Sequence, residues 1–291
     1  MWRHFLTHSA VTGLLIVLIF SAGCRGPRAE EPASEEQVSL SLLEQRLLRV
    51  IELEDQLEEI ASQPDAEYGE VQRRFQEVAA EYHGIIVRNP DDLNARLLYA
   101  KLLSRYGDRE TAWEQFITAA KLAENEDRQI AVIHQELSTY YAEEGDHTRA
   151  IAYALNAIDI EPETAAYHFG LGQVLAAFKP EFMADGIYSS ARIDEMMLKA
   201  FATAKDLQPD DPDLQFRYGE AFYDVEDPDW ESALAHWEQL ASFPGLSPFQ
   251  QDAILLHRAR CLAGLGRSDE ARQLANSVQS PELQESVKAL F

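Results

Sequence analysis

The sequence predicts an all-α protein built from antiparallel helical hairpins, and two of its features carry that prediction. Apolar residues recur at intervals of three, four and seven, the spacing that places them on one face of an α-helix. A glycine followed five residues later by an alanine separates two such stretches at Gly107 and Ala112, at Gly145 and Ala150, and at Gly266 and Ala271. Self-similarity of this kind is typical of proteins that stack one hairpin on the next.

Composition sets limits on the function. The chain has 291 residues and 46% apolar content, enough for a substantial core and too ordinary for wholesale disorder. It carries 25 Lys and Arg against 50 Asp and Glu, a balance that repels phosphate backbones and disfavours nucleic acid as a partner. No glycine loop for phosphate, nucleophile elbow, zinc-binding helix or Cys-x-x-Cys pair occurs in the sequence. We therefore expect no enzymatic activity and no cofactor.

The first residues have the layout of an export signal. Arg3 precedes an apolar run from Val11 to Phe20, and small residues lead to Cys24. The run is about half the roughly 20 residues that a spanning helix needs. The segment Ser21-Ala22-Gly23-Cys24 resembles the bacterial lipobox, although Ser21 stands where that motif usually has leucine.

The lipobox resemblance implies a signal peptide over residues 1–23 and a lipid-anchored mature chain that begins at an acylated Cys24. Arg25 follows, where lipoproteins retained in the inner membrane usually have Asp, and this favours the outer membrane, facing the periplasm. The lipid would be the only contact with the membrane. The alternative is an ordinary secretory signal with a chance cysteine.

Residues 24–36 are polar and proline-bearing, which is typical of a flexible tether. Residues 37–88 then predict a helical hairpin, with helices over Val38–Ile60 and from about Val71 to the turn at Asn89-Pro90. Dimerisation through the first of these helices is the less favoured use, and the oligomeric state stays open.

Residues 89–278 resemble the tetratricopeptide repeat (TPR). In the best copy the matching residues are Leu137, Tyr141, Gly145, Ala150, Ala157 and Pro162, with Ser138 where the family has glycine. Weaker copies carry Leu171-Gly172 with Phe201, and Tyr218-Gly219 with Trp237. The resemblance implies a right-handed superhelical solenoid of antiparallel hairpins.

Two segments depart from the repeat. Thirteen extra residues near 179–191 expose several apolar groups, as a contact loop would, or fold back over the core. Residues 279–291 carry Leu283, Val287, Leu290 and Phe291, which predicts a short helix capping the last repeat.

The family resemblance also implies a function, because stacked first helices of TPR proteins line a concave groove that grips a peptide or helix. We expect a non-enzymatic scaffold or assembly factor whose partner is a protein or peptide within an envelope complex. The alternative is a lipid-anchored receptor or enzyme accessory protein for a small molecule or glycan. The matching groove positions are Asn94, Leu97, Lys101, Arg105, Gln135, Thr139, Phe169, Gln173, Phe216, Glu220, Tyr223, Leu256 and Arg260.

Some of these residues admit a second interpretation. Phe169 and Phe216 are aromatic anchors for a partner, or they pack between helices. Lys101 and Arg105 form a basic cluster suited to a carboxylate. His134 and His168 occupy matching positions but have no carboxylate or cysteine in register, so we expect no metal site there. Cys261 is expected to be a buried structural thiol.

Overall fold

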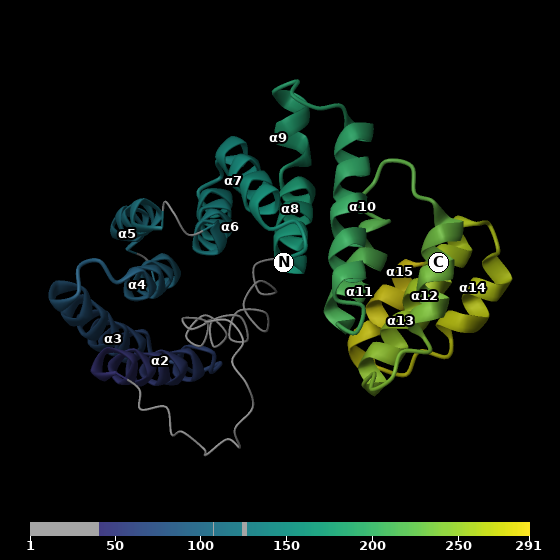
Figure 1. Ribbon diagram of the computed structural model, residues 1–291. Coiled ribbons are helices and arrows are strands. Elements are labelled where there is room, and N and C mark those ends of the chain that lie inside the picture. Colours follow the sequence, from purple (N-terminus) through teal and green to yellow (C-terminus); the bar gives the residue numbers. More distant parts are fainter. Residues whose placement is uncertain (1–40, 107, 124–126) are drawn as a thin grey trace, which may run out of the picture. The chain divides into compact units, whose positions relative to one another are not determined.

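A computed structural model describes residues 41–106, 108–123 and 127–291 of the chain. The predicted signal peptide, Cys24, the tether and the turn residue Gly107 lie outside these residues. Every regular element of the described chain is a helix, which confirms the predicted all-α class (Figure 1). No helix in the described ranges is both long enough and apolar enough to cross a membrane. The described residues fall into two compact units, and the chain passes from the first to the second between Pro90 and Asp91.

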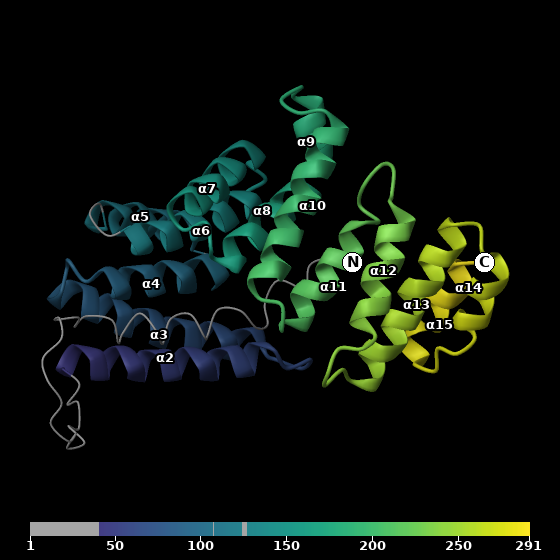
Figure 2. The ribbon, with the colours of Figure 1, turned by 45° about the vertical axis from the view of Figure 1, so that its right-hand side comes forward.

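The first unit contains one helical hairpin, made of α2 (Leu42–Ala61) and α3 (Tyr68–Arg88) (Figure 2). A capping box starts α2, because the Ser41 hydroxyl accepts from the amide of Glu44 and the Glu44 carboxylate accepts from the amide of Ser41. Between the helices, the buried Tyr82 donates from its hydroxyl to Glu54 at 2.9 Å. The predicted start of α2 at Val38 lies outside the described residues.

The second unit contains five hairpins in succession, followed by short helical turns. The hairpins are α4 (Leu93–Tyr106) with α5 (Arg109–Leu122), α6 (Asp127–Glu143) with α7 (His147–Ile160), α8 (Ala165–Ala177) with α10 (Ser190–Leu207), α11 (Pro212–Ala221) with α12 (Trp230–Leu240), and α13 (Pro248–Gly264) with α14 (Ser268–Ala275). Each helix packs against the helices before and after it in the chain, as neighbours in a repeat stack do.

The turns between paired helices follow the predicted glycines. Gly145 has a φ of 78° and Gly266 a φ of 74°, a left-handed conformation that glycine adopts without a steric penalty. The alanines five residues further on, Ala150 and Ala271, are fully buried between helices. The turn chemistry predicted from the repeat pattern is therefore confirmed at both sites.

Within two hairpins a glycine of the first helix contacts an aromatic ring of the second. A Cβ placed on Gly172 would lie 2.7 Å from the ring of Phe201, and one on Gly219 would lie 2.4 Å from Trp237. Ser138 stands at the corresponding place in the best repeat copy and is also buried. Its hydroxyl donates to the carbonyl of Ala150 at 2.8 Å, so the polar side chain is satisfied at the helix contact.

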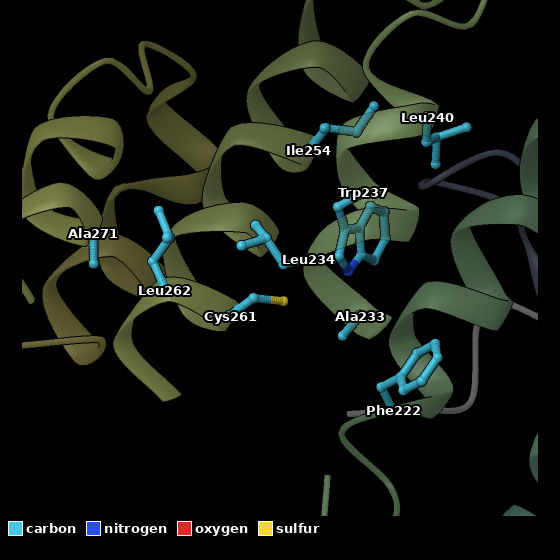
Figure 3. Close-up of a cluster of buried hydrophobic side chains, with 9 residues drawn as sticks. All are labelled: Phe222, Ala233, Leu234, Trp237, Leu240, Ile254, Cys261, Leu262 and Ala271. Carbon is cyan, nitrogen blue, oxygen red and sulfur yellow. The ribbon is translucent and has the colours of Figure 1, made fainter. Parts of the chain in front are cut away.

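Figure 3 shows the core of the last two hairpins, where Trp237 lies among Ile254, Leu240 and Cys261. Cys261 is fully buried, as predicted, and burial raises the pKa of its thiol. The tyrosine hydroxyl of Tyr223 lies 3.6 Å from its sulfur. This environment keeps Cys261 protonated and its thiol out of solvent.

The insertion between α8 and α10 folds partly onto the stack. It forms α9 (Lys179–Ala184), whose Phe182 is fully buried, while Met183 and Ile187 stay about half exposed. Nε2 of His147, at the start of α7, lies 2.7 Å from Oδ2 of Asp185. Both predicted behaviours of the insertion therefore occur, each in different residues.

The chain closes with a 3-10 turn (Pro281–Leu283) and α15 (Gln284–Ala289). The Asp252 carboxylate on α13 accepts hydrogen bonds from the amides of Gln279 and Ser280 and from the Ser280 hydroxyl. These bonds fix the start of the final segment to the last hairpin.

We predict that Gly219→Ala destabilises the protein by about 1–3 kcal/mol, because the added methyl overlaps the indole of the buried Trp237. Gly84→Ala is the matched control, since nothing lies within 4 Å of a Cβ at this position in α3. It should stabilise by up to about 1 kcal/mol through helix propensity. Urea unfolding followed by circular dichroism measures both effects, and equal stability of the two variants would contradict the packing described for Gly219.

Candidate functional site

The thirteen residues predicted to face a partner lie on the first helices of the five hairpins or directly after them; we call this set the candidate face. In the structure α4, α6 and α8 contact one another in succession, whereas α5, α7 and α10 pack mainly against first helices. The first helices α4, α6 and α8 thus form a connected layer. Side-chain contacts extend the layer to α11 and α13, and residues of the candidate face make many of these contacts.

Between α4 and α6 the contact is an ion pair. Nζ of Lys101 lies 2.9 Å from Oε1 of Glu136, and the lysine side chain is about nine-tenths buried. Glu136 therefore already neutralises one of the two cations predicted to hold a carboxylate. Leu97 is buried beside this pair, Asn94 is half-buried, and Arg105 is exposed.

Between α6 and α8 the contact is that of a side chain on a glycine backbone. A Cβ on Gly170 would lie 2.5 Å from Nε2 of Gln135, so the carboxamide rests directly on this glycine. Oε1 of Gln135 is buried and has no hydrogen-bond partner among the described residues. Thr139, one turn along, is exposed, and its hydroxyl donates to the Gln135 carbonyl at 3.2 Å.

Between α8 and α11 the central residue is Arg217, which the sequence analysis did not select. Its Nε donates to Oε1 of Gln173 at 3.0 Å, and its Nη2 lies 2.9 Å from Oδ2 of Asp224. The guanidinium carbon lies 4.3 Å from the centroid of the Phe201 ring. Arg217 is only 9% exposed, and its Nη1 is buried without a partner in the described chain. Arg217 lies on α11 and Asp224 in the turn that follows this helix, so helical spacing did not predict the pair.

Phe169 and Phe216 make aromatic contacts with second helices. The Phe169 ring meets Phe201 edge-on at 5.8 Å, and the Phe216 ring meets Trp237 edge-on at 5.4 Å. Both phenylalanines remain partly exposed. Each therefore contributes to packing while presenting part of its surface, so an alanine at either position removes a core contact as well as an exposed ring.

Between α11 and α13 the contacts are stacked rings. The Tyr223 ring is stacked on His257 at 5.6 Å, and the Arg260 guanidinium lies 4.0 Å from the Tyr223 centroid. Glu220 is largely buried nearby, and burial raises the pKa of its carboxyl even though Arg217 and Arg260 oppose the shift. Leu256, on α13, is partly exposed.

His257 is enclosed by aromatic rings on both sides, since it also stacks on Trp237 at 4.2 Å and an interplanar angle of 5°. Burial, with a smaller contribution from Arg260, lowers the pKa of His257 to about 4. The imidazole is therefore neutral in the folded protein at neutral pH.

The two histidines considered as a metal pair have separate partners. Nε2 of His168 lies 2.7 Å from the carbonyl oxygen of Pro162, and the His134 ring packs against Tyr153 at 5.5 Å. Among the described residues no three His, Cys, Asp or Glu side chains are grouped so that they could hold a metal ion.

Comparison with solved structures identifies the fold. PilW, a widely conserved type IV pilus biogenesis factor, superposes with a TM-score of 0.58 at 14% identity, over 86% of this chain and 100% of that one. YrrB, a TPR protein with an unusual peptide-binding site, gives a TM-score of 0.51 at 16% identity over 68% and 90%. PilF of Pseudomonas aeruginosa gives 0.51 at 15% identity over 81% and 97%.

The fold is therefore a TPR-like solenoid of antiparallel hairpins, as predicted. The sequence itself matches no family profile and no curated protein closely enough to count as a relative. At these identities the likeness concerns the fold, and the residues of the candidate face have to be judged on their own contacts.

We predict that His257→Phe reduces the acid sensitivity of the fold. A histidine whose folded-state pKa of about 4 lies below its ordinary value of about 6.5 costs stability as pH falls, because the unfolded chain binds the proton first. Between pH 7 and pH 5 the variant should lose about 2 kcal/mol less of the free energy of unfolding than the parent. Urea titrations at both pH values test this. His83→Gln, at an exposed position of α3, serves as control and should follow the parent.

Proposed function

We propose that this chain is a non-enzymatic scaffold or assembly factor of the bacterial envelope, which holds a peptide or helix of a partner protein on the candidate face. The fold supports the coarser part of this proposal, a protein-binding scaffold. Of the proteins with a similar fold, YrrB has a peptide-binding site and PilW is a pilus biogenesis factor.

The observation that carries the proposal is the continuity of the candidate face across all five first helices. Lys101–Glu136, Gln135–Gly170, Gln173–Arg217 and Tyr223–Arg260 link each first-helix region to the next. These contacts hold the side chains in place before a partner arrives, which lowers the conformational entropy lost on binding. Thr139, Arg260 and Arg105 remain exposed along the same series of helices.

The envelope location rests on the N-terminal sequence. An acylated Cys24 and a tether of about twelve residues would hold the folded body within about 40 Å of the membrane surface. The strong negative charge of the chain opposes direct adsorption of that body on anionic headgroups, so the lipid would be the attachment.

Photocrosslinking in intact cells tests the candidate face. A crosslinking amino acid placed at Thr139 or Arg260 should capture one defined protein partner, because both side chains are exposed on first helices. Leu155 on α7 and Gln239 on α12 are matched controls, since both are exposed on second helices. Capture of the same partner from the control positions with equal yield would contradict the assignment to the candidate face.

Cell fractionation tests the anchor. Cys24→Ser should shift the protein from the membrane fraction to the soluble fraction, because no acyl chain can be attached without the thiol. Cys261→Ser is the control, since that thiol is buried in the core and should leave the distribution unchanged. A Cys24→Ser protein that stays on the membrane would contradict lipid anchoring but would leave the candidate face untouched.

A further inference from the structure

A cavity of about 660 Å³ lies in the second unit, away from the residues of the candidate face. It is formed where the start of α5 meets the end of α6 and the turn into α7. Its volume falls within the range of ordinary ligand sites, about 300–1,000 Å³. Aromatic and charged side chains supply most of its lining: Trp113, Tyr140, Tyr141, Glu144, Asp146 and Arg149.

The aromatic ring of Tyr140 is in contact with a guanidinium group of the protein itself. Arg109 of α5 lies with its guanidinium carbon 5.0 Å from the Tyr140 centroid. The same guanidinium pairs with Glu143 at 2.9 Å and with Glu144, and it donates to the Tyr140 carbonyl at 3.1 Å. One cation is thus held by an aromatic face and by carboxylates together.

Tyr141 repeats this arrangement. The Arg149 guanidinium lies 4.1 Å from the Tyr141 centroid, and its Nε lies 2.7 Å from Oδ2 of Asp146. The Tyr141 ring is also stacked on Tyr153, with the rings nearly parallel and their centroids 5.5 Å apart. Both tyrosines of the cavity are therefore already occupied by cations or rings.

Trp113 is the third aromatic residue of the cavity, and its indole is 38% exposed. Its Nε1 donates to the Tyr141 hydroxyl at 2.7 Å, which fixes the orientation of the ring. Within the described chain neither a cation nor another ring lies over the indole, although Trp is the most favourable of the aromatic side chains for a cation. Trp113 thus offers an aromatic face of the same kind, held in place and open.

The local charge agrees with an additional cation. The cavity is lined by two carboxylates, from Glu144 and Asp146, and by one guanidinium, from Arg149. The neighbouring ion pair of Arg109 and Glu143 adds one charge of each sign. The Glu144 side chain stays 44% exposed and lines the same cavity as Trp113. The whole chain, at a formal charge of −25, attracts basic partners over longer distances.

We propose that this cavity binds an arginine side chain from a basic segment of a partner protein, with the guanidinium stacked on Trp113 and paired with Glu144. The bound arginine completes a third aromatic–guanidinium–carboxylate unit beside the two that the protein builds from its own residues. The site uses the hairpin edge and not the candidate face, so it does not depend on the proposed function. Trp, Tyr and Arg are also the residues most often found at the energetic centres of protein interfaces.

Fluorescence anisotropy tests the proposal with the full chain in a non-ionic detergent. The probe is a fluorescein-labelled Gly-Arg-Gly-Arg-Gly peptide, and its twin carries citrulline, a neutral isostere, in place of arginine. The arginine peptide should bind, and the citrulline peptide should bind at least about fivefold more weakly because it lacks the charge. Equal affinity for the two peptides would overturn the proposal.

Variants locate the binding. Trp113→Leu and Glu144→Gln should each weaken the arginine peptide about fivefold, and Trp113→Phe, which keeps an aromatic face, should bind more tightly than Trp113→Leu. Glu163→Gln removes the same charge at an exposed position outside the cavity lining and should leave the affinity unchanged. Circular dichroism verifies folding, and Glu144→Gln decides the outcome if Trp113→Leu does not fold. Equal loss in Glu144→Gln and Glu163→Gln would show only general charge attraction and would overturn the site.

Discussion

The close approach of paired helices is the constraint on which the rest of the second unit depends. Where Gly172 meets Phe201 and Gly219 meets Trp237, the absence of a side chain on one helix makes room for a large ring from the other. Fully buried alanines have the same role beside the turns. The two helices of each hairpin therefore pack closely, and successive hairpins can stack. In the stack, side chains of one first helix contact those of the next.

That proximity explains the chemistry of the candidate face. Contacts such as Lys101–Glu136 and Gln173–Arg217 join residues that are 35 and 44 positions apart in the chain. These contacts combine charged, amide and aromatic groups. The same layer contains two buried atoms that have no hydrogen-bond partner among the described residues, Gln135 Oε1 and Arg217 Nη1. A fully apolar layer would have packed the helices without such groups, so their presence agrees with a surface suited to recognition as well as to stability.

Sequence patterns within single repeats predicted the hairpins well, because the turns and helix contacts of a hairpin involve residues that are close in the sequence. The positive φ of Gly145 and Gly266, the burial of Ala150 and Ala271, and the burial of Cys261 all follow from spacing within one repeat. The contact partners of Lys101 and Phe169 could not be predicted from this spacing, because they depend on which side chains of neighbouring helices come together. Arg217 was missed because it lies one residue outside the expected register. The cavity around Trp113 was missed because it lies at the turns and not on the face that the repeat family uses.

The insertion after α8 has a mechanical consequence. A stack in which each hairpin contacts only its neighbours bends like a spring, with compliance shared among its junctions. Here Asp185 reaches back to His147 of the preceding hairpin, while Lys179 pairs with Asp194 and donates to the Asp224 carbonyl of the following one. Through these contacts the insertion is bonded to three consecutive hairpins. Bending of the second unit at the two junctions between these hairpins therefore has to break bonds of the insertion in addition to the contacts between first helices.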